Sequence, residues 1–228
     1  MIAPVSGAAG RLSPMSRDHD PLWTAVHAER AALADDLATL TDDRWAQPSL
    51  CAGWSVQDVV AHLTAGASHG RAAWFRSVVG ARFDFAAHND RRLAEQRGAG
   101  PAETLARFRS VVASTTAPPG PVAAWLGEVV VHGQDVRRPL GLTGAPPVDV
   151  VTHVAELFVG RDVTVDGRAA IRGLRVEATD GPFRAGDADG DVVRGSTLAL
   201  TMAVAGRAAF CDDLSGPGVA TLRARCGS

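Results

Sequence analysis

The stretch that decides the fold is residues 125–135, which read Trp-Leu-Gly-Glu-Val-Val-Val-His-Gly-Gln-Asp. In a helix, Glu128, His132 and Asp135 fall at positions i, i+4 and i+7 and share one polar stripe. Carboxylate oxygen and neutral imidazole nitrogen are ordinary zinc ligands, and adjacent helical turns bring them within reach of one ion. Taken alone, this spacing is more typical of a solvated helix. A metal site needs further ligands from elsewhere in the chain.

Amphipathic periodicity places this helix in a bundle. We predict helices over residues 21–40, from residue 55 onward, over residues 102–115, and from residue 122 to about residues 137–139. Ser55 and Asp58 give the second helix a start that resembles a capping box. Four such helices with modest connections predict a helical bundle, with ligand sites between facing helices.

The second helix supplies the missing ligand. His62 lies next to an apolar face and is predicted to point inward, where a hydrogen-bonded core histidine is the commoner role. If it joins Glu128 and His132, two imidazoles and one carboxylate leave open coordination for water or a substrate atom. His69 is a rival ligand, but for His69 and His88, in a region of mixed helix and loop character, we expect exposed positions.

Two further residues have competing interpretations. Cys51 could be a nucleophile, although a small buried apolar residue is favoured. Glu29 interrupts the apolar stripe of the first helix and is expected to keep its carboxylate in water. The three cysteines are too few and too scattered for a disulfide framework, so reduced thiols are predicted.

The pattern changes after residue 147. We predict a linking helix over residues 148–163, strands over 174–178 and 191–194, one helix over 196–210 and a final element over 219–225. The predicted organisation is therefore a flexible tail at residues 1–20, a helical bundle at 21–147, and a linking helix with a small domain at 148–228. The fold class is α+β.

Composition narrows the range of partners. The 228 residues are 46% hydrophobic, which is enough for a sizeable core. A net charge of -2 and a pI near 6.4 argue against nucleic acid as a partner. Apolar runs fall short of the roughly 20 residues that a bilayer helix needs, and the first residues lack a secretory pattern. A cytoplasmic protein without a membrane partner is predicted.

Several chemistries suit an open zinc site. The ion could activate water for hydrolysis, polarise a carbonyl, or bind a thiol as thiolate. The His-Glu-x-x-His motif of zinc proteases is absent, since Val129 follows Glu128. A two-histidine, one-carboxylate iron oxygenase remains possible by ligand type, although its usual barrel is not predicted.

A family resemblance is carried by two stretches. Residues 45–63 read WAQPSLCAGWSVQDVVAHL and residues 127–135 read GEVVVHGQD. Together with shorter matches near residues 174–180, 193–195, 205–207 and 214–216, they resemble the mycothiol-dependent maleylpyruvate isomerase family of the DinB-like superfamily. The resemblance spans about residues 21–225. It implies a DinB-like four-helix bundle followed by a small α+β domain related in shape to sterol-carrier modules.

The resemblance also implies a site. Zinc would be held by His62, Glu128 and His132, and the thiol cofactor would be mycothiol. Arg207 would hold an anionic substrate or the thiol, or would instead cap a helix. Asp135 would receive the imidazole N–H of His132, or would neutralise a nearby arginine, Arg137 or Arg138.

The predicted function follows from this likeness. A metal-bound thiolate would add to a small electrophile: isomerases then rotate the adduct and eliminate the thiol, whereas S-transferases stop at the adduct. Alternatives from other classes are a non-catalytic metal- or small-molecule-binding protein and a zinc-dependent hydrolase.

Overall fold

The computed structural model describes residues 20–68, 92–161 and 165–226. The predicted tail, apart from residue 20, and both His69 and His88 lie outside these residues. The first part of the chain contains α1 (Pro21–Ala38), α2 (Asp42–Trp45), α3 (Val56–Ser68), α6 (Pro101–Ser110) and α7 (Val122–Leu140). The second part contains α8 (Val148–Gly160), α9 (Gly167–Ala170), β1 (Leu174–Ala178), β2 (Arg184–Gly186), β3 (Asp191–Gly195), α10 (Thr197–Val204), the 3-10 helix η2 (Ala208–Asp213) and α11 (Val219–Arg225).

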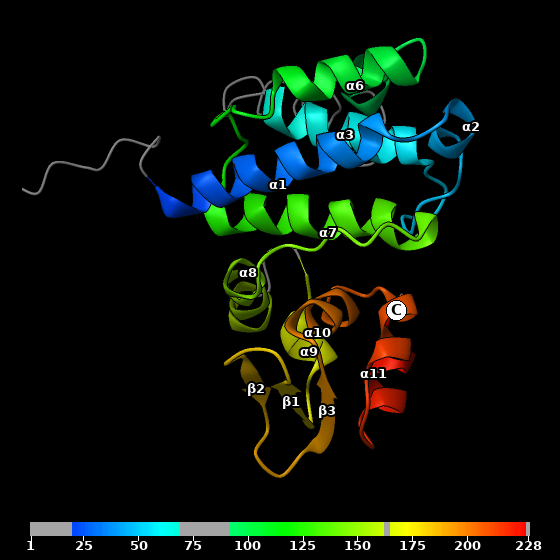
Figure 1. The fold of residues 1–228 in the computed structure, drawn as a ribbon. Helices are drawn as coiled ribbons and strands as arrows, with labels where there is room; N and C mark the ends of the chain where they lie inside the picture. The colour runs from blue at the N-terminus through cyan, green and yellow to red at the C-terminus, as the bar shows by residue number, and fades with distance from the viewer. Residues whose placement is uncertain (1–19, 69–91, 162–164, 227–228) are drawn as a thin grey trace, which may run out of the picture.

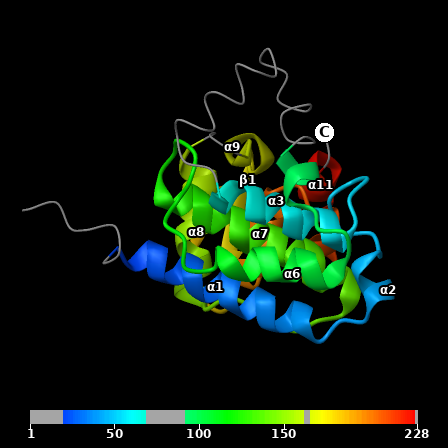
Figure 2. The same ribbon diagram turned by 90° about the horizontal axis from the view of Figure 1, so that it is seen from above.

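The first part is the predicted helical bundle. Helix α1 packs against α6 and α7, and α3 packs against the same two helices. Figure 1 shows α7 along the lower side of this bundle, and the view from above in Figure 2 shows α1, α3 and α6 lying over it. Leu33, Val59, Phe108 and Leu126, one from each helix, are fully buried where these helices meet. The bundle therefore confirms the fold expected from periodicity.

A charged cluster is also buried between α1 and α7. Arg137 is only 2% exposed; its Nε donates to Asp36 at 2.6 Å, and Glu29 lies 4.0 Å away. The prediction that Glu29 keeps its carboxylate in water is wrong, because the residue is 6% exposed. Burial raises the pKa of Glu29, against the attraction of Arg137. Glu29 thus adds a second carboxylate near the buried guanidinium of Arg137.

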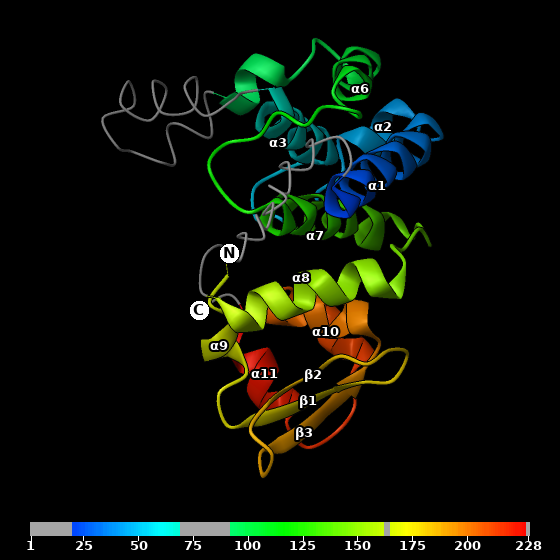
Figure 3. The same cartoon turned by 90° about the vertical axis from the view of Figure 1, so that its left-hand side faces the viewer.

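The second part is a small α+β domain, as expected. Its sheet has the order β2-β1-β3, with β1 antiparallel to β2 and parallel to β3. Helix α10 packs on β1 and β3 and also contacts α8, which in turn contacts α7. Figure 3 shows the resulting order: the bundle, α8, α10 and then the sheet. Helix α8 thus connects the bundle to the sheet domain.

Several helix ends differ from the prediction; the helix expected over residues 102–115, for example, ends at Ser110. The single helix expected over residues 196–210 ends at Val204, because Gly206 adopts a left-handed backbone (φ 87°), and η2 follows. Arg207 therefore lies between two helices. Helix α7, predicted to end at about residues 137–139, includes Pro139 and ends at Leu140, with Gly141 as a left-handed cap.

Pro139 changes the hydrogen bonding of α7. Proline has no N–H, so it cannot donate to the carbonyl four residues earlier, which belongs to Asp135. The Asp135 carbonyl instead accepts from the backbone N–H of Leu50 at 3.0 Å. The connector between α2 and α3 is thereby attached to α7 at the position of a predicted site residue.

Candidate metal centre

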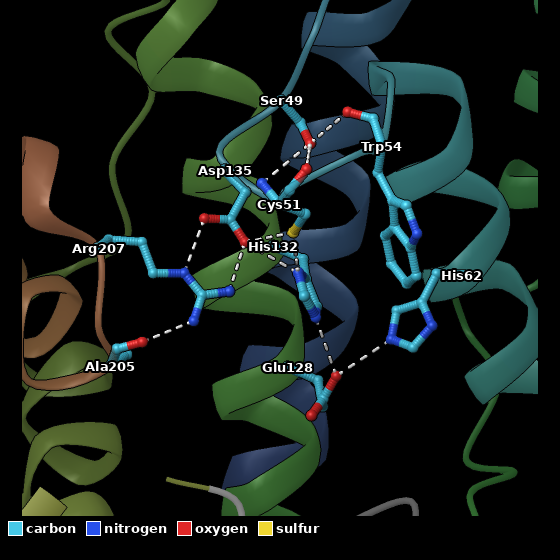
Figure 4. A network of polar contacts seen from close by, with 9 residues as sticks. All are labelled: Ser49, Cys51, Trp54, His62, Glu128, His132, Asp135, Ala205 and Arg207. Carbon is cyan, nitrogen blue, oxygen red and sulfur yellow. Dashed lines mark hydrogen bonds and ion pairs between the residues drawn. The ribbon is translucent and has the colours of Figure 1, made fainter. Parts of the chain in front are cut away.

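The structure brings His62, Glu128 and His132 together. His62 comes from α3, while Glu128 and His132 lie one turn apart on the facing α7. The Nε2 atoms of His62 and His132 lie 3.5 Å and 3.3 Å from Oε2 of Glu128, and one donor atom from each residue lies within 4.8 Å of the others. Figure 4 shows the three side chains converging. These are the three ligands implied by the sequence.

The start of α3 fixes the position of His62. The Ser55 backbone N–H donates to Oδ2 of Asp58 at 3.0 Å, and the Asp58 backbone N–H lies 3.3 Å from the Ser55 hydroxyl. This is the reciprocal pattern of a capping box, and it begins the helix two turns before His62. The Trp54 ring lies beside the His62 ring, with 5.1 Å between centroids. The imidazole is therefore held from both its own helix and the connector.

Two of the three separations between the donor atoms fit a tetrahedral ion. With zinc–ligand distances of roughly 2.0–2.1 Å, neighbouring ligands lie about 3.4 Å apart. The observed separations of 3.3 Å and 3.5 Å from the Glu128 oxygen agree with that edge. Burial alone would raise the pKa of Glu128, but hydrogen bonds and charge from His132 and His62 lower it strongly. Glu128 is thus an ionised carboxylate that is available as a ligand.

Asp135 orients the ring of His132. Its Oδ2 lies 2.9 Å from Nδ1 of His132, and an ionised carboxylate can only accept a hydrogen bond. The proton of the neutral imidazole therefore belongs on Nδ1, which leaves Nε2 with a free lone pair on the Glu128 side. Burial alone would lower the pKa of His132, but Asp135, Cys51 and Glu128 together raise it. A proton and a metal ion would compete for Nε2.

Arg207 reaches the same carboxylate from the second domain. Its Nε and Nη2 donate to the two oxygens of Asp135 at 3.0 Å and 2.7 Å, and its Nη1 donates to the Ala205 carbonyl at 2.7 Å. Arg207 thus reaches the site and also binds the carbonyl of Ala205, the C-cap of α10, while its role in holding a substrate or thiol stays a prediction. Burial would raise the pKa of Asp135, but His132 and Arg207 lower it to about 2.

The alternative partners of Asp135 are engaged elsewhere. Arg137 pairs with Asp36 inside the bundle, and Arg138 pairs with Asp213 of η2 and lies over the Phe210 ring. Of the two roles considered for Asp135, the geometry therefore favours the support of His132.

The connector adds residues to the site that the sequence interpretation did not assign to it. The thiol of Cys51 donates to Oδ2 of Asp135 at 3.1 Å and lies 3.4 Å from Nδ1 of His132. Ser49 holds the turn closed, because its hydroxyl accepts from the Cys51 N–H and donates to the Trp54 carbonyl. Cys51 is half-buried and hydrogen-bonded to the site, so it is not the buried apolar residue that was favoured from sequence.

One signal in the sequence could have identified these residues. Cys51 and Trp54 stand inside the stretch 45–63 that carries the family resemblance, a few residues before His62. Their contacts depend on the path of an irregular connector, and periodicity does not describe such segments.

A second group of donor atoms lies on the other side of His132. Cys51, His132 and Asp135 also place one donor atom each within 4.8 Å of the others. Both oxygens of Asp135 already accept from Arg207, so a cation bound there would face a fixed positive charge. The site formed by His62, Glu128 and His132 is therefore the better candidate. Figure 4 shows Arg207 and the Glu128 carboxylate on different sides of His132.

Comparison with known families supports the resemblance. Residues 26–120 match the family model described as the mycothiol maleylpyruvate isomerase N-terminal domain. The match includes α3 with His62 and ends before α7, which carries Glu128 and His132. The resemblance drawn from the sequence is confirmed over these residues. No curated protein matched the chain.

Two solved structures share the fold. One is a mycothiol-dependent maleylpyruvate isomerase with a histidine-to-alanine substitution; it is 16% identical with a TM-score of 0.54. The other is a structure of the mycothiol-dependent maleylpyruvate isomerase, 17% identical with a TM-score of 0.51. Each comparison covers 89% of this chain and 96% of the other. This similarity extends the fold assignment over both parts of the molecule.

Proposed function

We propose that this chain is a metal- and thiol-dependent isomerase acting on a small electrophile, with mycothiol as the thiol. The observation that carries the proposal is the convergence of His62, Glu128 and His132 from two facing helices, with both imidazoles at zinc-ligand spacing from the Glu128 oxygen. The family-model match over residues 26–120 supplies the reaction class. S-transfer to the same kind of electrophile is the related alternative.

The ligand set suits zinc. Two imidazole nitrogens and one carboxylate oxygen are zinc ligands, and three protein ligands leave a coordination position open, as in catalytic zinc sites. Bound at this position, zinc would supply Lewis acidity that makes a thiol nucleophilic near neutral pH.

The surrounding residues have separate tasks in this proposal. Asp135 keeps the Nδ1 proton of His132 in place, so Nε2 stays available as a ligand. Arg207 uses three of its five N–H groups on Asp135 and Ala205, and its remaining N–H groups can hold an anionic group of the substrate or of the thiol. Trp54 lies beside the His62 ring and restricts its movement on that side.

The test begins with metal content. We expect the purified protein, after incubation with zinc and desalting, to retain an equimolar amount of the metal by elemental analysis. His62→Ala and Glu128→Ala should retain far less, whereas His153→Ala, which removes an exposed histidine from α8, should behave as the natural chain does.

The thiol is tested on the same protein. Cobalt(II) replaces zinc, and mycothiol is expected to change the visible absorption of the bound cobalt and to be required for isomerisation of maleylpyruvate. An equimolar metal without any response to mycothiol would instead support the non-catalytic metal-binding protein. Turnover of an ester without thiol would support a hydrolase, and accumulation of a thiol adduct would identify an S-transferase.

A further inference from the structure

Two cysteines of the second domain lie side by side. Cys211 belongs to η2 and Cys226 follows the last residue of α11. Their sulfur atoms are 4.0 Å apart, although 15 positions separate them along the chain. All three cysteines are free thiols, as predicted, and the fold brings two of them close together despite their scatter along the chain.

We propose that Cys211 and Cys226 form a reversible disulfide by exchange with a low-molecular-weight disulfide. A disulfide bond is about 2.05 Å long, so the two sulfurs must approach by about 2 Å, a distance that side-chain rotation can supply. The competing contacts of Cys226 are weak: its thiol donates to the carbonyls of Ala203 at 3.4 Å and Leu222 at 3.5 Å. Little hydrogen bonding is lost when the pair closes.

The chemistry is two successive exchanges. Cys226 is half-buried whereas Cys211 is 1% exposed, so Cys226 reacts first. Its thiolate attacks one sulfur of the small disulfide, forms a mixed disulfide and releases one small thiolate. The Cys211 thiolate then attacks the Cys226 sulfur and releases the second. The two protein thiols lose two electrons and two protons, and the small disulfide gains them as two thiols.

The environment sets the rate of this exchange. Burial raises the pKa of both thiols, that of Cys226 to about 11, while the guanidinium of Arg223 acts in the opposite direction. Asp212, which is bonded to Arg223, further raises the pKa of Cys211. Thiolate is therefore scarce at neutral pH, and exchange should be slow there and faster as pH rises.

The cross-link would join the C-terminal helix to the segment that carries Arg207. Helix η2 begins at Ala208, directly after Arg207, so a bond at Cys211 restrains the chain four residues beyond the guanidinium that holds Asp135. Cys51 has a different role, because its thiol is hydrogen-bonded to Asp135.

The test uses the full-length natural protein. It is incubated with bis(2-hydroxyethyl) disulfide, the remaining thiols are alkylated, and trypsin then separates the two cysteines by cleaving after Arg223 and Arg225. We expect the peptides of Cys211 and Cys226 to be joined, and dithiothreitol to separate them. The melting temperature should rise on oxidation, because the bond closes a loop in the unfolded chain.

Two variants complete the design. Cys51→Ser should give the same joined peptides, and Cys226→Ser should give none. The proposal is overturned if the folded natural protein keeps Cys211 and Cys226 unlinked under these conditions. It is equally overturned if either residue pairs with Cys51, or if only mixed adducts with the small thiol accumulate.

Discussion

At the scale of single residues, Asp135 holds the site together. Its side chain is fully buried and accepts from His132, Arg207 and Cys51, which come from a helix, an interhelical segment and a connector. A buried carboxylate that accepts from several donors restrains the side chains around it. Breaking one of these hydrogen bonds would leave its charge partly unpaired where little water can reach it. The proposed ligand His132 depends on this arrangement.

Asp135→Asn tests that dependence. The amide loses the negative charge that holds the Nδ1 proton of His132, so we expect zinc affinity to fall by about 10- to 100-fold. Competition with a chelating indicator measures the change. Asp213→Asn is the matched control, since it breaks only a surface pair with Arg138 and should leave affinity unchanged. Equal affinities in the two variants would argue against a supporting role for Asp135.

Glu29 gives a pH-dependent prediction. Its pKa in the folded chain is raised above 4.5 by burial, so the folded chain holds this proton more tightly than the unfolded chain does. The residue therefore favours folding at pH below 4.5 and loses that contribution as pH rises through the raised value. Relative to the natural chain, Glu29→Gln should become more stable as pH rises from about 4 to about 7.

Urea unfolding at several pH values checks the Glu29 prediction. Glu156→Gln, on the exposed face of α8, serves as the control for the substitution itself. A Glu29→Gln difference that stays constant or falls with rising pH would contradict the expected sign.

The residues of the candidate site were predictable to different degrees. His62, Glu128 and His132 stand at helical spacing or beside an apolar face, so periodicity and the family resemblance select them. The resemblance also pointed to Arg207, but its pairing with Asp135 depends on how two parts of the fold meet. The burial of Glu29 was missed because a buried charge requires a partner, here Arg137, from a distant helix.

At the scale of elements, the turn between α2 and α3 determines how Trp54 reaches His62. Gly53 adopts a left-handed backbone with φ 79°, and a Cβ there would meet no atom within 4 Å. The cost of a side chain at this position is therefore conformational and not steric. We expect Gly53→Ala to lower the free energy of unfolding by about 1–2 kcal/mol.

Two further variants make this prediction specific. Gly53→Asn should lose less stability, because asparagine tolerates the left-handed region better than alanine. Gly66→Ala, inside α3 and also without a close neighbour, should instead stabilise the chain by roughly 0.5–1 kcal/mol. Urea denaturation would reveal the expected opposite signs, and a Gly53→Ala protein as stable as the natural one would contradict the argument.

Helices and strands were predicted where the local sequence pattern determines them, and they were missed where it does not. β1 and β3 were expected from their alternating side chains, and the helices of the bundle from their apolar stripes. β2 has three residues and no usable alternation, so it was missed. The early end of α10 depends on the left-handed Gly206, and a single glycine in a helical pattern does not by itself determine that conformation.

At the scale of the whole molecule, the two parts meet through Asp135 and Arg207. The expected division near residue 147 stays a proposal, and the hydrogen bonds across it make the metal centre and η2 one connected structure. None of the helices in the described ranges is long and apolar enough to span a membrane.

We therefore expect metal binding to affect the second part of the chain as well. Zinc is expected to slow amide hydrogen exchange in α3 and α7 and also in residues 207–213, because it fixes His132, Asp135 and then Arg207. Arg207→Met should abolish the effect in residues 207–213 and leave some protection in α3. Arg194→Met, which removes a pair on the sheet, is the control. Hydrogen-exchange mass spectrometry with and without zinc reads both effects, and protection confined to the bundle in the natural protein would refute the coupling.

The attachment of the connector to α7 depends on Pro139. The residue is exposed, yet the hydrogen atom that it lacks leaves the Asp135 carbonyl free for Leu50. The N–H that α7 lacks at Pro139 thus allows the connector to bind to α7 through Leu50. Leu50 lies one residue before Cys51 and four before Trp54. Any other residue at this position would bring an N–H that competes with Leu50 for the Asp135 carbonyl.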